Sequence, residues 1–173
     1  MECKAIDHIG ILVADLEQGI KRWGDATGYR FSPITRYKTD RYVDRTNPAP
    51  HHHETRTSMS WQGPPYIELL EVSGTGTHGP DQLGVHHIGF VQDGQEEACA
   101  VLRELAAMGI PDDGRSLDTE GLPLLWFTAP EALDGIRLEI IAPVGQPVVD
   151  ERGRRIAVDE SGRPRIWEIE TEH

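Results

Sequence analysis

Two histidines and two glutamates occupy matching places in two similar stretches of the chain. His8 and His87 each stand in an x-His-Ile-Gly-apolar run, and Glu68 and Glu139 each follow in a later apolar run. Imidazole nitrogens and carboxylate oxygens together suit a borderline or hard divalent cation such as Zn²⁺, Co²⁺, Ni²⁺, Mn²⁺ or Fe²⁺. If the two stretches pack about a pseudo-twofold axis, each supplies one histidine and one glutamate. We therefore predict one divalent metal ion, with one or two positions left for water or substrate.

Each of these residues also has a structural explanation when it is taken alone. A single histidine in an apolar strand is more often a core or edge residue than a ligand, and a single glutamate in a strand usually faces solvent. The apolar neighbours of Glu68 and Glu139, however, indicate strands in which every second side chain is buried. A buried carboxylate without a partner is costly. The recurrence of the same residue types in both halves therefore favours the metal site.

An internal duplication would position these residues. Residues 5–13 reappear as residues 84–91, with the His-Ile-Gly core shared. Apolar residues at helical spacing follow each copy. The expected ends of these two helices are capping-box pairs at the start (Asp15 with Gln18, Asp93 with Glu96) and glycines after the last turn (Gly28, Gly109).

Apolar and β-branched runs predict the remaining elements as strands. Their expected ranges are Tyr29–Tyr37, Thr55–Trp61, Tyr66–Leu70, Leu124–Thr128 and Ile136–Ile141. The order strand, helix and three strands then occurs in each half. We predict an α+β fold in which two paired βαβββ modules form an open sheet cup around the metal site.

The composition of the intervening segments sets the expected boundaries. The modules should span residues 1–75 and 84–144, with a glycine-rich linker at 76–83. Residues 39–54 are rich in Pro, Arg, Asp and His, which predicts a loop. Residues 145–173 are polar and contain two charged turn-like runs, so we expect a weak hairpin or an arm.

The overall composition narrows the class of protein. Hydrophobic residues make up 38% and charged residues 27% of 173 residues, which is typical of a globular chain. A formal net charge of −12 argues against a nucleic-acid partner, because a polyanion would be repelled. No run approaches the length of a membrane span, and the first residues lack an apolar signal segment. Two cysteines, Cys3 and Cys99, are too few for a disulfide framework, so we expect reduced thiols in a cytoplasmic protein.

These residues resemble a known family, the vicinal oxygen chelate superfamily of glyoxalases, bleomycin-resistance proteins and extradiol dioxygenases. The runs that carry the resemblance are Asp7-His8-Ile9-Gly10-Ile11, Ile67-Glu68-Leu69-Leu70-Glu71-Val72, His86-His87-Ile88-Gly89-Phe90 and Leu138-Glu139-Ile140-Ile141-Ala142-Pro143. The resemblance implies that His8, Glu68, His87 and Glu139 are the metal ligands, with His87 preferred over His86 because it aligns with His8. Among members of the family, the chain looks most like methylmalonyl-CoA epimerase.

The resemblance also implies a reaction class. A metal-dependent epimerase, isomerase or lyase of this kind moves a proton next to a carbonyl group through a metal-bound enolate, so the expected partner is a small carbonyl-containing molecule. One alternative is an Fe(II)-dependent ring-cleaving dioxygenase, in which Glu68 would be a bystander. Another is a non-catalytic binding protein of the same fold. A homodimer is left open.

The base that would move the proton is not identified by the ligand set. The run His51-His52-His53-Glu54 precedes an expected strand of the first module, so Glu54 or His51 is a candidate. The alternative is a solvated loop with exposed histidines. In that case the base must be sought among the ligands themselves, Glu139 included.

Overall fold

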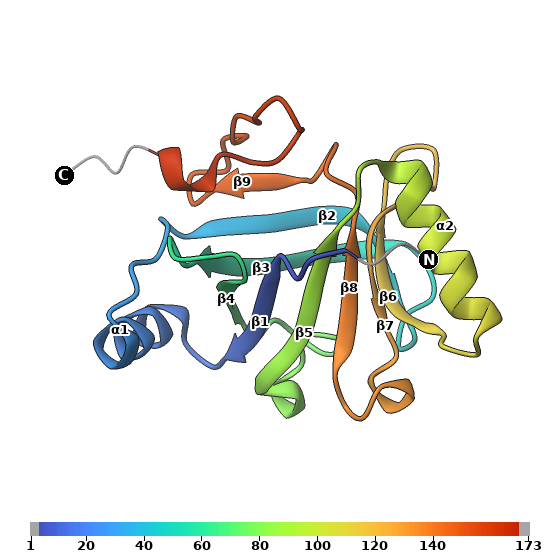
Figure 1. Cartoon of the computed structure of the whole chain (residues 1–173), viewed down its shortest axis with the longest axis horizontal. Helices are drawn as coiled ribbons and strands as arrows, with labels where there is room; N and C mark the ends of the chain where they lie inside the picture. Colours follow the sequence, from blue (N-terminus) through green and yellow to red (C-terminus); the bar gives the residue numbers. More distant parts are fainter. Residues whose placement is uncertain (1–3, 170–173) are drawn as a thin grey trace.

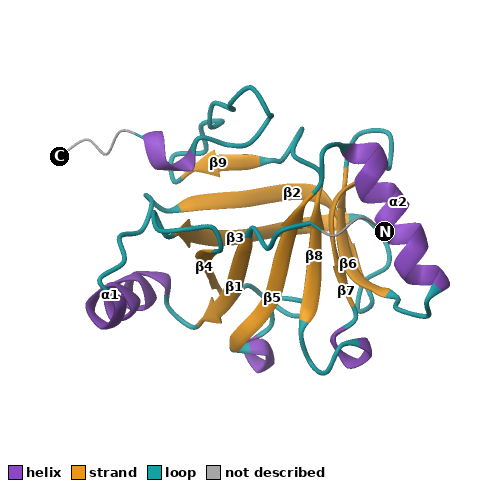
Figure 2. Cartoon of the chain, viewed as in Figure 1, coloured by secondary structure: helices purple, strands orange, loops and turns teal. Residues whose placement is uncertain are grey.

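A computed structural model describes residues 4–169, which form one strongly curved sheet with two α-helices on its outside (Figures 1 and 2). The first half contains β1 (His8–Val13), α1 (Leu16–Thr27), β2 (Thr35–Asp44), β3 (His51–Met59) and β4 (Tyr66–Glu71). The second half contains β5 (Gly84–Val91), α2 (Gln95–Ala107), β6 (Asp112–Leu117), β7 (Pro123–Thr128) and β8 (Arg137–Ile141), and β9 (Val148–Asp150) follows. None of the helices in the described residues is long and apolar enough to cross a membrane.

Both halves have the same strand order. β1 pairs in parallel with β4, which continues to β3 and β2, and β5 pairs in parallel with β8, which continues to β7 and β6. The halves join twice, through antiparallel pairing of β1 with β5 and of β2 with β6. The α+β prediction is therefore confirmed, and the two halves are arranged as related modules.

We expected an open sheet cup, but the sheet closes into a barrel-like cup. β2 makes this closure, because it is a ten-residue strand that pairs with β3 along much of its length and with β6 at its C-terminal end. β9 adds to the other end of β2 through residues 35–37. The predicted loop at residues 39–54 is wrong for the same reason, since β2 runs through Asp44 and β3 begins at His51.

Alternation in the strands separates an apolar outer face from a polar inner face. Outward side chains of β1 and β4 pack under α1, with Ile11, Leu16 and Leu69 at the centre of that core. Outward side chains of β7 and β8 pack under α2, with Trp126 and Ile140 at the centre of the second core. Glu68 and Glu139 lie on the opposite face of the same strands, so their apolar neighbours belong to the helix-facing cores.

The helix ends only partly follow the expected pattern. Asp15 caps α1 by accepting from the backbone N–H of Gln18, and Gly28 ends the helix with a φ of 74°. Asp93 does not cap α2, because Gly94 takes the N-cap position and has no side chain to donate or accept. Gly109 follows α2 with a φ of 81°. The tail contains β9 and a further bridge between Val158 and Pro164, while Cys3 lies outside the described residues.

Separating the halves would remove both seams between them. Residues 1–75 alone would lose the pairing of β1 with β5 and of β2 with β6, and would open the polar inner face to water. We expect this fragment to dimerise or to fail to fold, measured by sedimentation and by thermal unfolding followed by circular dichroism. A monomeric fragment with a cooperative melt would contradict the paired-module description, and the full chain is the reference.

Candidate metal centre

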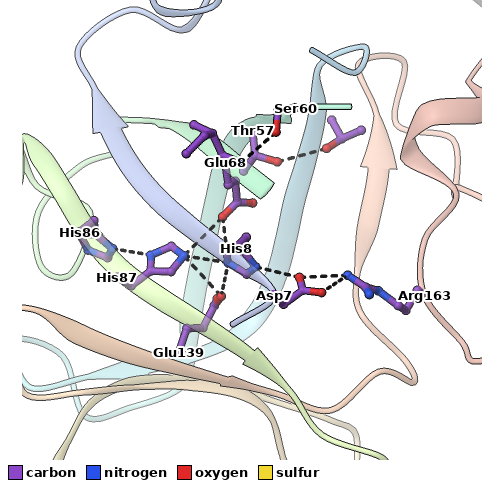
Figure 3. Close-up of polar contacts among 11 residues, drawn as sticks. Asp7, His8, Thr57, Ser60, Glu68, His86, His87, Glu139 and Arg163 are labelled. Carbon is purple, nitrogen blue, oxygen red and sulfur yellow. Dashed lines mark hydrogen bonds and ion pairs between the residues drawn. The ribbon is translucent and has the colours of Figure 1, made fainter. Parts of the chain in front are cut away.

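The side chains of His8, Glu68, His87 and Glu139 converge on the inner face of the sheet (Figure 3). They come from four adjacent strands, β1, β4, β5 and β8, and one ligand atom from each lies within 4.8 Å of the others. His87 is fully buried, and His8 and Glu139 are 3% and 6% exposed. This cluster can hold a metal ion, and it joins residues that are separated by as many as 131 positions in the chain.

The glycine of each His-Ile-Gly run makes room for the histidine of the other run. Gly10 on β1 lies opposite His87 on β5, and Gly89 lies opposite His8. A Cβ atom on Gly10 would come 2.0 Å from Cε1 of His87, and one on Gly89 would come 2.2 Å from Cε1 of His8. Both imidazoles therefore lie directly over the neighbouring backbone, which only glycine permits.

The same glycines bring each glutamate beside a histidine. Gly10 is also in register with Glu68 on β4, and Gly89 with Glu139 on β8. One row across the sheet therefore contains Glu68, Gly10 and His87, with the glycine in the middle. The second row contains Glu139, Gly89 and His8 in the same arrangement. Side chains from the outer two strands of each row meet above the glycine, so strand register alone assembles the donor set.

The distances between ligand atoms fit a single cation. Nε2 of His8 lies 3.0 Å from Oε2 of Glu139 and 3.5 Å from Oε2 of Glu68. Nε2 of His87 lies 3.4 Å from each of these oxygens and 3.0 Å from Nε2 of His8. Metal bonds of about 2.0–2.2 Å would separate neighbouring ligand atoms by roughly 3–3.5 Å. The four side chains therefore fit the divalent metal ion that the sequence predicts.

His87 presents a lone pair to the cluster because of its neighbour. Nε2 of His86 lies 2.6 Å from the carbonyl oxygen of Thr77, which can only accept, so that nitrogen carries the proton. Burial lowers the pKa of His86 to about 3 and that of His87 to about 4, so both rings are neutral. Nδ1 of His86 then accepts from Nδ1–H of His87 at 2.8 Å, which leaves Nε2 of His87 unprotonated.

His8 is oriented by the residue before it as well. Its Nδ1–H donates to Oδ2 of Asp7 at 3.0 Å, so Nε2 faces the cluster. Burial alone would lower the pKa of His8, but hydrogen bonds with Asp7 and Glu139 and the charge of Glu68 raise it to about 10. A bound cation would replace the proton on Nε2. Burial also raises the pKa of Glu68, which a nearby positive charge would offset.

Comparison with known proteins identifies the family of the chain. The family model described as the glyoxalase/bleomycin resistance protein/dioxygenase superfamily matches residues 7–121. The chain belongs to this superfamily. No curated protein matches the sequence.

Solved structures share the fold of this superfamily member at low sequence identity. A methylmalonyl-CoA epimerase in complex with methylmalonyl-CoA and NH4+ is 19% identical with a TM-score of 0.51, over 88% of this chain and 99% of that one. A Streptomyces coelicolor methylmalonyl-CoA epimerase variant in complex with 2-nitronate-propionyl-CoA is 20% identical with a TM-score of 0.52, over 89% and 99%. The enzyme from Mycobacterium tuberculosis is 17% identical with a TM-score of 0.52, over 79% and 86%.

Two cavities of this superfamily member reach Glu68 and Glu139. A small one of about 50 Å³ is lined by Tyr42, His53 and His78, together with Phe127. A larger one of about 140 Å³ is bordered by residues of the C-terminal segment. Tyr37 lines both cavities. The candidate metal centre therefore borders two cavities through which a small molecule can approach it.

The two candidate bases outside the ligand set lie away from these cavities. Glu54 points outward from β3, where it forms ion pairs with Arg36 and Lys38. His51 and Glu54 line a separate surface groove of about 350 Å³. His53 lies between the two regions, since it borders both this groove and the small inner cavity. The assignment of Glu54 or His51 as the base stays a prediction, while Glu139 lies within the cluster itself.

The aromatic residues near the site differ in whether they line these cavities. Phe127 faces inward and lines the small cavity, whereas Trp126, the next residue, is buried under α2. Trp61 is 46% exposed beneath the guanidinium of Arg30, and Tyr66 contacts the ring of Trp167. Sequence reasoning missed the partners of the histidines, Asp7 and His86, because their role depends on which residue lies behind each ring.

Replacing the glycine beneath an imidazole should disturb the site directly. Gly10→Ala would force His87 or β1 to move, and we expect a loss of about 1–3 kcal/mol in the free energy of unfolding, as for an overpacked core. Chemical denaturation would measure it. Gly24→Ala is the control, because its Cβ would meet no atom closer than 3.3 Å and alanine favours a helix. Equal stability of the two variants would contradict the close approach.

Acid should destabilise the fold through its neutral inner histidines. Burial, helped by neighbouring His51, lowers the pKa of His53 from its usual 6.5 to about 4. The unfolded chain therefore binds this proton first, so the contribution of His53 is complete above pH 6.5 and is lost as the pH falls towards 4. We expect His53→Gln to reduce the pH slope of the unfolding free energy by up to about 1.4 kcal/mol per pH unit.

Denaturant titrations at several pH values between 4 and 7.5 would test this effect. His52→Gln is the matched control, since it removes an exposed imidazole from the same strand. An unchanged slope in His53→Gln would show that this ring is not held neutral by the fold.

Proposed function

We propose that this protein is a divalent-metal-dependent enzyme that moves a proton next to a carbonyl group, with epimerisation as the favoured reaction. The single observation that carries the proposal is the convergence of two histidines and two glutamates, from equivalent positions of two modules, beside a cavity of about 140 Å³. When bound, the ion supplies a Lewis acid that stabilises negative charge on a carbonyl oxygen. His8, Glu68, His87 and Glu139 would hold it.

The chain's own residues orient the two imidazoles and bury the ligand residues. Asp7 and His86 hold the two imidazoles with Nε2 towards the cluster. His8, His87 and Glu139 are buried, and burial strengthens the electrostatic interactions among them. A proton acceptor within about 3 Å of the substrate, or one water further away, completes the requirement.

The cavity-facing groups are better placed than the groove-facing groups to accept that proton. Glu139 borders both cavities, and His53 borders the smaller one as a neutral imidazole. Glu54 and His51 remain candidates only if the substrate extends into the surface groove. We therefore propose that either Glu139 or His53 accepts the proton, with Glu54 and His51 as the alternative.

A thioester is the substrate class that the comparisons favour. The solved structures of similar fold include methylmalonyl-CoA epimerases in complex with CoA thioesters. A proton beside a thioester carbonyl is acidic enough for this chemistry once the carbonyl oxygen is polarised. The cavity of about 140 Å³ suits a small acyl group and not a whole coenzyme, so the remainder would extend outside. The net charge of −12 opposes an anionic substrate at long range, which a local pocket can override.

The position of Glu68 weighs against the ring-cleaving dioxygenase alternative. That alternative treats Glu68 as a bystander, yet its Oε2 lies 3.4 Å from Nε2 of His87, the same separation as Oε2 of Glu139. A non-catalytic binding protein would not need four donors that converge on one point. Both observations support an enzyme of the epimerase type.

The experiment combines metal content with proton exchange. Protein loaded with Co²⁺ or Zn²⁺ should bind about one equivalent, and His87→Ala and Glu139→Gln should lose it while most of the fold remains. In D₂O, the wild type should incorporate deuterium beside the carbonyl of methylmalonyl-CoA or a related small acyl-CoA. Glu17→Gln, which removes an exposed carboxylate of α1, is the control.

Separate outcomes would contradict separate parts of the proposal. Undiminished stoichiometric metal in both ligand variants would reject the four-residue site. Stoichiometric metal with no exchange in any acyl-CoA, but with O₂ consumption by the Fe²⁺ form on a catechol, would favour the dioxygenase. If His53→Gln exchanges normally while Glu54→Gln loses roughly 10²–10⁴-fold in rate, the base lies in the surface groove.

A further inference from the structure

The C-terminal segment, residues 145–169, lies against the metal centre and not apart from the barrel. β9 pairs with β2, and Trp167 donates from Nε1 to the carbonyl oxygen of Ser60 at 3.2 Å. The segment also supplies one side of the larger cavity that reaches Glu68 and Glu139, through Gln146, Val148, Arg163, Pro164, Ile166 and Trp167. Figure 1 shows β9 alongside β2, with the rest of the segment close to one end of that strand. The stretch whose sequence predicts a polar tail therefore lines one side of the cavity at the candidate metal centre.

Arg163 connects this segment to the first histidine. Its Nη2 donates to both oxygens of Asp7, at 2.8 Å and 3.0 Å. The Asp7 side chain is only 11% exposed and has Nδ1–H of His8 on its other side. Figure 3 shows the three side chains in line, from Arg163 through Asp7 to His8. Across 156 residues of sequence, this line joins the tail to the first strand.

The two histidines of the cluster have different supports behind them. His87 is backed by neutral His86, which is anchored on a backbone carbonyl and needs no further charge. His8 is backed by a carboxylate, that of Asp7, at Nδ1, while the carboxylates of Glu68 and Glu139 lie at Nε2 of the same ring. A carboxylate in such surroundings needs a positive partner to stay in place. Arg163 is that partner, and a single guanidinium nitrogen, Nη2, contacts both oxygens.

We propose that Arg163 is a positioning residue of the metal centre, which holds Asp7 against Nδ1–H of His8 and so directs Nε2 of His8 to the ion. The C-terminal segment is thereby a part of the active site. Outer partners of metal-bound histidines typically contribute about 10–100-fold to metal affinity. Arg163 acts through Asp7, so its contribution depends on the carboxylate being there.

The test measures Zn²⁺ affinity of the full-length protein by competition with a chelator. Arg163→Lys keeps the positive charge but replaces the planar guanidinium, whose Nη2 contacts both oxygens of Asp7, with a shorter ammonium, so it separates geometry from charge. We expect Arg163→Lys to weaken Zn²⁺ binding about tenfold, and Asp7→Asn to weaken it about 10–100-fold. In the double variant, Arg163→Lys should change the affinity less than twofold beyond Asp7→Asn, because the carboxylate that it holds is gone.

Arg165→Lys is the matched control. It makes the same substitution two residues away on the same segment, where Arg165 pairs with exposed Glu168 at 3.2 Å. We expect Zn²⁺ affinity within twofold of the wild type. A further readout is the long-range ¹H–¹⁵N NMR spectrum, which should assign the proton of the His8 ring to Nδ1 in the Zn²⁺ form of the wild type.

The results separate this proposal from the proposed function on which it rests. If the wild type binds no divalent metal, the metal centre itself is rejected. If the wild type binds Zn²⁺ but Arg163→Lys stays within twofold of it, or if the effect of Arg163→Lys persists in the Asp7→Asn background, only the role of Arg163 is overturned. An equal loss in Arg165→Lys would attribute the effect to the segment as a whole.

Discussion

The antiparallel pairing of β1 with β5 is the constraint on which the site depends. It sets Gly10 against His87 and Gly89 against His8, and each glycine leaves the space that the opposite imidazole fills. A shift of one residue in this register would turn the side chains of a strand to the other face. The metal cluster, the seam between modules and the shared His-Ile-Gly sequence are therefore consequences of the same pairing.

Around this seam the barrel uses its two faces for different purposes. The outer face of each module is apolar and packs under a helix, which gives the fold its two hydrophobic cores. The inner face is lined by imidazoles, carboxylates and hydroxyl groups, which would be costly to bury without partners. Stability and chemistry are thus separated on opposite sides of the same strands, so substitutions inside the barrel can alter the site while the helix-facing cores remain.

The sequence predicts the parts of this structure that recur. Matching runs around His8 and His87, and around Glu68 and Glu139, indicated related modules and a common cluster, because a duplication exposes residues that repeat in register. β6 was missed, since Asp112–Leu117 has no apolar alternation and is held as a strand by β7 and β2. The closure of the barrel was missed as well, because residues 39–54 have the composition of a loop.

The partners behind the histidines lie beyond what spacing can predict. His86 was set aside because His87 aligns with His8, yet its place next to His87 is what fixes the protonation of that ring. Arg163 stands in a charged turn far along the chain, and nothing in its local sequence indicates a contact with Asp7. Such contacts depend on where the chain returns in space, and pairing by β9 decides that.

The closure by β2 also determines which sheet edges the protein presents. Within residues 4–169, each of the strands β1 to β8 has neighbours on both sides in the ring, and β9 is the strand that ends the sheet. β9 has three residues, and its outer side is itself covered by residues 154–156, through a bridge between Val149 and Arg155 and a hydrogen bond from the N–H of Asp150 to the carbonyl oxygen of Arg154. Unpaired edges are where chains add to one another and aggregate, and closed sheets remove them. Self-association of the described barrel is therefore expected to use side-chain surfaces and not the addition of strands to β9.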